Sequence, residues 1–447
     1  MHLIWENLIK NLILLWTGEF KGLDEGSGCY VIDASVWDAI GVVSHKAGKT
    51  IPGCYGARPP NFRTDKQSMT ADTWSFWALY LGPVLLNRKF RNEEYYWHFI
   101  ELVRLLHLCL QFEITLQEVE EIRSGFIAWV KKYEELYYQY DPARISTCPL
   151  TIHALLHIAD CILFCGPIWT YWAFPMERYC GIIRPFIRSR KRPYPSLDRA
   201  VLEIARLFQI GLLYNLQDQL YTLHRHRALK VPAGAVRIDG YEYTLLPPSH
   251  PVTSSLLVEK VKRGLGTRFE LSGGRFPSGE LKTDVLKRLV AGTRITEFAT
   301  ARVDNGDDLH AASMLTAAQA AERRDATYVR YQMVVDRRAR RPGRSQNEFT
   351  TFYGHLQHIL RIDLPAEPAI KLARPSTVVF ALLNECQLEA NHDVLDIHYY
   401  QKENPALEPV DLDCLMCVVG RVPLNKSYWA IIDRSGAIAR AIWSGDD

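Results

Sequence analysis

Hydrophobic residues recur at three- and four-residue intervals through most of the first half of the chain. Three segments between residues 70 and 140, which begin TADTWSFW, NEEYYWHF and TLQEVEEI, keep this spacing and so place their apolar side chains on one face of a helix. Residues 1–16 follow the same pattern. Glu6 and Lys10 interrupt that apolar run, which favours a packed amphipathic helix over a membrane span or a signal peptide. The pattern predicts an all-α region over residues 1–230.

The pattern changes in the second half. Residues 231–325 alternate Gly-, Pro- and Ser-rich loops with helical patches near 280–298 and 310–324, which indicates a linker or irregular extension with short helices. Residues 326–447 contain short runs rich in Val, Ile and aromatic residues, which are typical of strands. Several short strands in succession favour a small β-rich, barrel-like domain. The expected fold class is therefore α+β, with an N-terminal helical region and a C-terminal β-rich domain.

Composition adds only broad limits to this picture. The chain has 447 residues, 48% of them hydrophobic, and a net charge of +3. This length allows two or three domains with a true core, and this charge is too small to indicate nucleic-acid binding unless local clusters carry it. The ten cysteines are scattered and follow no secretory start, so reduced thiols are expected. Because the chain begins within a helix of core type, we expect an upstream segment to be missing.

The candidate chemistry is concentrated between His153 and Arg192. His153 and His157 stand four residues apart, so they share a helix face and are candidates to hold one metal ion. A closed zinc site needs two more ligands. Cys161 and Cys165 are candidates, although their apolar surroundings favour two buried cysteines. The histidines alone also fit a packed helix without any metal.

Glu177 follows in an aromatic-rich setting and precedes a run of cations. A carboxylate beside cations suits a metal-dependent reaction on phosphate, but a two-metal site needs two or three carboxylates. Two basic runs are candidate DNA-phosphate contacts, or else solvated loops, and the second also resembles a nuclear-localisation signal. The cations of the first run are Arg184, Arg188, Arg190, Lys191 and Arg192, and those of the second are Arg337, Arg338, Arg340, Arg341 and Arg344.

These segments together resemble the C-terminal part of the catalytic region of CACTA-type (En/Spm) DNA transposases, of the fungal type. The resemblance rests on HALLHIA…GPIWTYWAFPMERYCGIIRPFIRSRKRP, on the opening MHLIWENLIKNLILLWTGEFKGLDEG, and on the tail VVGRV…YWAIIDRSGAIARA. It covers residues 1–230 strongly and residues 325–447 as the accompanying tail. It implies the helical part of an RNase H-like core that cuts and joins DNA in the nucleus.

The family holds divalent metal, expected to be Mg²⁺, with an Asp, Asp, Glu triad, and Glu177 matches the final acid. A similar spaced histidine pair before a glutamate occurs in the V(D)J recombinase, where it completes a zinc site with an upstream CxxC. That likeness gives a zinc role to His153 and His157. In the family both aspartates and the CxxC lie upstream of the segment that matches this chain. We therefore expect one metal acid, half a zinc site, poor Mg²⁺ binding and no DNA cleavage by this chain alone. The resemblance implies DNA, a second copy of this chain or an intact transposase subunit as partners. It implies no membrane partner.

Two other functions stay open. The first is a domesticated, non-catalytic protein that binds chromatin or peptides through its β-rich domain, where Tyr399, Tyr400 and Trp429 could form an aromatic cage. The second is an α-helical zinc enzyme in which two histidines and Glu177 bind the metal as a 2-His-1-carboxylate site.

Overall fold

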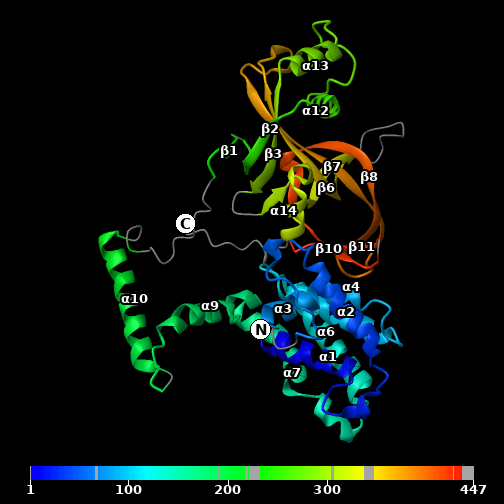
Figure 1. Ribbon diagram of the computed structural model, residues 1–447. Helices are drawn as coiled ribbons and strands as arrows, with labels where there is room; N and C mark the ends of the chain where they lie inside the picture. Colours follow the sequence, from blue (N-terminus) through cyan, green and yellow to red (C-terminus); the bar gives the residue numbers. More distant parts are fainter. Residues whose placement is uncertain are drawn as a thin grey trace.

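The protein combines an N-terminal helical region with a C-terminal antiparallel sheet, which confirms the predicted α+β class (Figure 1). The computed structural model describes residues 2–65, 69–189, 191–216, 220, 232–238, 240–303, 307–336, 347–425 and 427–434.

The helical region is built from short and medium helices. They are α1 (Lys10–Trp16), α2 (Ala34–Ala47), α3 (Ala71–Phe76), α4 (Gly82–Leu85), α5 (Glu94–Cys109), α6 (Leu116–Tyr133), α7 (Leu150–Ala154), α8 (Ile158–Cys165), α9 (Phe174–Ile183) and α10 (Tyr194–Tyr214). The π-helical stretches His2–Ile9, Trp77–Leu81 and Glu134–Tyr138 adjoin α1, α4 and α6. No single helix in the described part of the chain is long and apolar enough to span a membrane. Leu150–Cys165 and Ile168–Phe186 meet these criteria only as a pair, which is bent by 73°.

Large aromatic side chains fill the centre of this region. Trp16 is fully buried, and its ring meets those of Phe90 and Phe99 edge to face, at centroid distances of 5.4 and 5.3 Å. Its indole Nε1 donates to the hydroxyl of Tyr137 at 3.0 Å, which satisfies the one polar atom that the ring brings into the core. These contacts hold α1 against α5 and against the π-helical turn after α6.

Local sequence signals define α6 as the hydrophobic pattern predicts. The Thr115 hydroxyl accepts from the Glu118 backbone N–H at 3.2 Å, and the Glu118 carboxylate accepts from the Thr115 N–H at 2.7 Å. This reciprocal capping box satisfies two backbone donors that the start of a helix leaves open. From there the apolar side chains recur on one face and are buried; they are Val119, Ile122, Phe126, Trp129, Val130 and Tyr133.

All strand pairings in the C-terminal half are antiparallel. The strands are β1 (Val236–Arg237), β2 (Tyr243–Pro251), β3 (Arg294–Val303), β4 (Asp308–His310), β5 (Tyr328–Asp336), β6 (Asn347–Leu364), β7 (Ser376–Asn391), β8 (Ile397–Asp411), β9 (Leu415–Val418), β10 (Gly420–Pro423) and β11 (Trp429–Ile432). Strand pairing runs from β5 through β6, β7, β8 and β11 to β10. On its other side β5 pairs with β9, and only Val419 separates β9 from β10 in the chain. The chain connection between β9 and β10 therefore closes the circuit of paired strands.

The segment 231–325, predicted as a linker with short helices, is part of this sheet. Strand β3 pairs with β2 on one side and with β6 on the other, and α12 (Ser255–Arg268) and α13 (Lys282–Ala291) pack on the sheet as a second core. The helical patch expected over 280–298 ends at Gly292, after which the chain enters β3. The patch expected near 310–324 contains α14 (Ala317–Glu322). The helix period was visible in the sequence, but the long-range pairing of β2 and β3 has no local signal.

The helical region and the sheet share one hydrophobic core. Tyr55 of the helical region donates its hydroxyl hydrogen to the Val418 carbonyl at 3.0 Å and accepts from the Arg434 N–H at 3.0 Å. The backbone N–H of Arg421 donates to the Thr50 carbonyl at 3.0 Å. These buried bonds join the two halves in a fixed orientation.

Candidate functional site

The two predicted metal ligands converge on the protein surface. His153 lies near the end of α7 and His157 in the short turn that follows, and both are exposed. Their Nε2 atoms are 3.1 Å apart. Zinc bonds to imidazole nitrogen at about 2.0–2.1 Å, so two nitrogens on one tetrahedral ion stand roughly 3.3 Å apart. The pair is thus spaced to chelate one ion.

The cysteines that follow are exposed, contrary to the expectation that Cys161 and Cys165 are buried. They continue the exposed four-residue spacing of the histidines along α8 because this face of the helix turns away from the core. Across the described residues, no three or more His, Cys, Asp or Glu side chains are grouped to hold a metal ion. The histidine pair would need ligands from elsewhere, and zinc binding stays a prediction.

Glu177 lies in the first turn of α9 with about half of its side chain exposed. Its Oε1 is 2.8 Å from Nε2 of His2. Hydrogen bonds to Glu6 and, to a smaller extent, to Glu177 raise the pKa of His2. The neighbour of Glu177 is therefore a histidine that its partners favour in the charged form. In the described part of the chain Glu177 does not join His153 and His157 in one metal site.

The first basic run lies between α9 and α10. Arg184, Arg188, Lys191 and Arg192 are exposed, and none makes an ion pair with a described residue. Arg190 and the second run, Arg337, Arg338, Arg340, Arg341 and Arg344, lie outside the described residues. The run that can be placed thus presents free cations close to Glu177 in the sequence.

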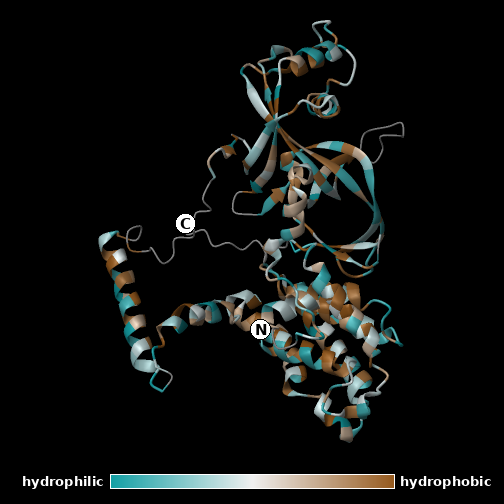
Figure 2. Cartoon of the chain, in the orientation of Figure 1, coloured by the Kyte–Doolittle hydropathy of each residue, from teal (hydrophilic) through white to brown (hydrophobic). Residues whose placement is uncertain are grey.

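Helices α9 and α10 form an arm that extends away from the helical body (Figure 1). We define the arm as residues 166–214. Apolar residues recur along α10 (Figure 2), but only Ala200 and Gly211 of this helix are buried. The large apolar side chains that the arm exposes are Trp169, Tyr171, Met176, Tyr179, Ile182, Phe186, Ile187, Tyr194, Val201, Leu202, Leu207, Phe208, Ile210, Leu212, Leu213 and Tyr214. The number of large apolar side chains that the arm exposes makes it a candidate interaction surface.

The aromatic cage considered for the β-rich domain is occupied by the chain itself. The Arg421 guanidinium lies 3.3 Å from the ring centroid of Tyr328 and 4.6 Å from that of Trp429. It donates to the Tyr400 hydroxyl at 2.9 Å and to Asp325 at 2.7 Å. An internal cation thus fills the space where a ligand cation would bind.

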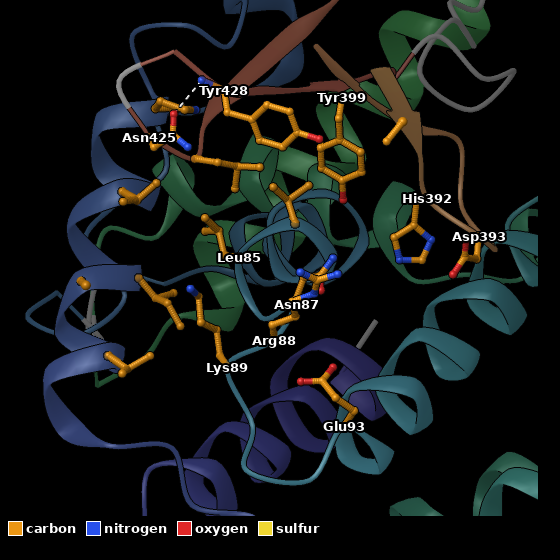
Figure 3. Close-up of a pocket in the computed structure, with 18 of the residues that line it drawn as sticks. Leu85, Asn87, Arg88, Lys89, Glu93, His392, Asp393, Tyr399, Asn425 and Tyr428 are labelled. Atoms are coloured by element: carbon orange, nitrogen blue, oxygen red, sulfur yellow. Dashed lines mark hydrogen bonds between the residues drawn. The ribbon is translucent and has the colours of Figure 1, made fainter. Parts of the chain in front are cut away.

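Tyr399, the third residue of that expected cage, points to the opposite side of β8, because successive side chains of a strand alternate. There it lines a cavity of about 1040 Å³ between the helical region and the sheet (Figure 3). The walls come from α2, from residues 84–97, from residues 390–399, and from residues 423–425 and Tyr428. No local sequence signal marks this cavity, because its walls are distant in the chain and share no motif.

No protein-family model, no curated protein and no solved structure matches the chain.

Proposed function

We propose that the protein is transposase-derived and corresponds to the C-terminal part of a CACTA DNA transposase of the fungal type. In this proposal its helical region belongs to an RNase H-like core, its place of action is the nucleus, and its partner is DNA. The chain is catalytically incomplete by itself.

The arm is the observation that carries the proposal. A catalytic acid of a two-metal site works with carboxylates from other elements, and Glu177 has none grouped with it among the described residues. Within the part of the chain that the structure describes, the helices around Glu177 leave most of their large apolar side chains exposed. Packing of the arm on a further protein, such as an intact transposase subunit, would cover its apolar side chains. The same contact would bring the missing carboxylates to Glu177.

The exposed cations support contact with DNA. Arg184, Arg188 and Arg192 follow α9 without a described acidic partner, so their charges are available to phosphate. Each phosphate contact by such a cation steepens the salt dependence of binding, with a slope of roughly −0.9 per contact on a log–log scale.

Catalytic incompleteness is tested with the purified chain and duplex DNA in Mg²⁺ or Mn²⁺. We expect no strand cleavage by the wild-type protein. Cleavage that is lost in Glu177→Ala and kept in Glu203→Ala, an exposed acid on α10, would overturn the proposal.

DNA binding is tested by a salt titration. The triple variant Arg184→Glu, Arg188→Glu, Arg192→Glu should bind duplex DNA more weakly and with a shallower salt slope than wild type. The matched control replaces Lys46, Lys131 and Lys371, which are exposed elsewhere, with Glu. Equal effects of the two triple variants would assign the binding to net charge and not to the arm.

A further inference from the structure

The cavity between the helical region and the sheet has the size and position of a ligand site. Its volume of about 1040 Å³ lies at the upper end of the roughly 300–1,000 Å³ that small-molecule sites occupy, and such sites favour domain junctions. Apolar side chains of α2, of residues 84–85 and of Ala390, Pro423 and Leu424 form part of its wall, and the rest of the lining is polar or aromatic.

Aromatic rings line the cavity from two sides. Tyr428 is parallel to Tyr399, with an interplanar angle of 6° and ring centroids 5.8 Å apart. The Asn425 side chain accepts from the backbone N–H groups of Ser427 and Tyr428 at 3.0 and 2.8 Å, which fixes the hairpin that presents Tyr428 (Figure 3). Trp97 of α5 lines the cavity with 42% of its surface exposed. A planar ligand can therefore stack on a fixed aromatic surface.

Two cations stand at the same cavity. Arg88 and Lys89 are exposed and make no ion pair with any residue that the structure describes. The backbone of Arg88 has φ of +56°, a left-handed conformation that costs a residue with a side chain roughly 1 kcal/mol. The fold thus keeps a strained turn that brings both side chains to the cavity (Figure 3). Unpaired guanidinium and ammonium groups suit an anionic ligand such as phosphate.

His392 is a fixed structural residue of the wall. Its Nδ1 accepts from the backbone N–H groups of Val394 and Leu395, both at 3.1 Å. Nε2 therefore carries the proton and donates to the Tyr96 hydroxyl at 2.9 Å. Because both ring nitrogens are hydrogen-bonded, His392 joins the loop after β7 to α5. Its imidazole is not free to contact a charged ligand.

Two carboxylates, Glu93 and Asp393, also line the cavity, and only one of them lies on the side of Arg88 and Lys89. Figure 3 shows Asp393 beside His392, on the side of the cavity away from α2, and Lys89 on the side nearer α2. Glu93 lies just before α5, on the same side of the cavity as Arg88 and Lys89 in this view, so two cations face one carboxylate there. An anionic group is therefore favoured near Lys89 and Arg88, and an aromatic ring near Tyr428.

We propose that this cavity binds a nucleotide, with its base stacked on Tyr428 and its phosphate held by Arg88 and Lys89. A free nucleotide and an unpaired nucleotide of a DNA strand offer the same chemistry. The inference does not depend on the transposase origin of the chain, since it rests on the cavity alone.

The first test is calorimetric titration of the full chain with adenosine monophosphate, adenosine and inorganic phosphate. Adenosine monophosphate should bind at one site, and more tightly than adenosine or inorganic phosphate. Tyr428→Ala should weaken binding roughly 5- to 150-fold, the range for loss of one base–aromatic stack, and Lys89→Glu should remove it. Lys131→Glu, an exposed lysine of α6, should leave affinity unchanged. Absence of binding, or equal binding by wild type and both cavity variants, would overturn the proposal.

A blocking variant separates binding from folding. Ala39 of α2 is exposed and lines the cavity, so Ala39→Trp fills the space without removing a contact. It should keep the wild-type melting temperature and lose nucleotide binding, while Val42→Trp, on α2 outside the cavity, keeps both properties. Retained affinity in Ala39→Trp would contradict the assignment.

The two sources are distinguished by competition. A single-stranded oligothymidylate that displaces adenosine monophosphate from wild type, and does not bind Ala39→Trp, identifies an unpaired DNA nucleotide as the ligand. Binding of the mononucleotide alone identifies a free nucleotide. Binding of an acidic peptide in place of either would overturn the proposal. The arm variants that test duplex binding leave the cavity intact, so the two proposals fail independently.

Discussion

Helices α5 and α10 have comparable amphipathic sequences and opposite surroundings. Helix α5 buries ten of its 16 residues, and α10 buries two of its 21. The hydrophobic pattern in both cases predicts a helix with one apolar face. What differs is the presence of a surface to cover that face, which the sequence of the helix itself does not contain. In the described part of the chain most of the apolar face of α10 is therefore exposed, whereas that of α5 lies in the core.

The largest expected difference between α5 and α10 is in how much a substitution on each helix changes the free energy of unfolding. Leu102→Ala on α5 should lower the free energy of unfolding by about 2–5 kcal/mol, because Leu102 is fully buried and the substitution leaves a cavity. Leu213→Ala on α10 should change it by less than about 0.5 kcal/mol, because 77% of Leu213 is exposed. Chemical denaturation of both variants makes the measurement. Equal losses would show that α10 is packed in the isolated chain.

Acid should destabilise the helical body through His98 of α5. This side chain is buried and stacked on Trp129, at a centroid distance of 4.3 Å, and burial lowers its pKa to about 4. The unfolded state then binds more protons between pH 6.5 and 4, so stability is full above pH 6.5 and falls as the pH drops. The loss from this residue between pH 7 and pH 4 is about 3 kcal/mol.

Urea denaturation at several pH values, together with an NMR titration of His98, measures this effect. A His98 resonance that titrates near pH 6.5 in the folded protein would contradict the expected burial. Burial also lowers the pKa of His107, His310 and His392, which adds to the loss in acid, whereas the raised pKa of His2 opposes it.

A smaller effect is expected from polar substitutions on the arm. Replacing Leu212 and Leu213 with Gln should leave the melting temperature unchanged and reduce concentration-dependent self-association, because exposed apolar surface drives aggregation. Light scattering over a concentration series measures this. Loss of thermal stability in the double variant would mean that these side chains already have a partner within the chain.

The smallest effect concerns zinc. Among the described residues no further ligand is grouped with the two converging histidines, so they should hold zinc weakly and chelation with EDTA should leave the melting temperature nearly unchanged. Metal analysis of the purified protein is the check. One equivalent of retained zinc that is lost in His157→Ala would favour a zinc enzyme or a complete structural site.

Local patterns predicted the elements better than their connections. The helix period and the Thr115–Glu118 cap were sufficient for α6, and the β-branched runs after residue 326 were sufficient for the later strands. The strand β3 was not predictable in the same way, since its role depends on β2 and β6, which lie far away in the chain. Long-range pairing is set by tertiary contacts and not by the period of one segment.

The candidate site shows the same limit. The four-residue spacing of His153 and His157 correctly places them on one helix face, because helix geometry fixes that relation. Burial of Cys161 was predicted wrongly, because an apolar sequence indicates a covered face only where a covering element exists. The contact between Glu177 and His2 joins residues that no local rule relates.

In the part of the chain that the structure describes, most large apolar side chains of the arm that carries Glu177 have no surface covering them. Hydrogen–deuterium exchange of the isolated protein tests this central claim most directly. We expect amides of α10 to exchange rapidly through local opening, while those of α5 exchange only with global unfolding. Protection of α10 equal to that of α5 would contradict the claim.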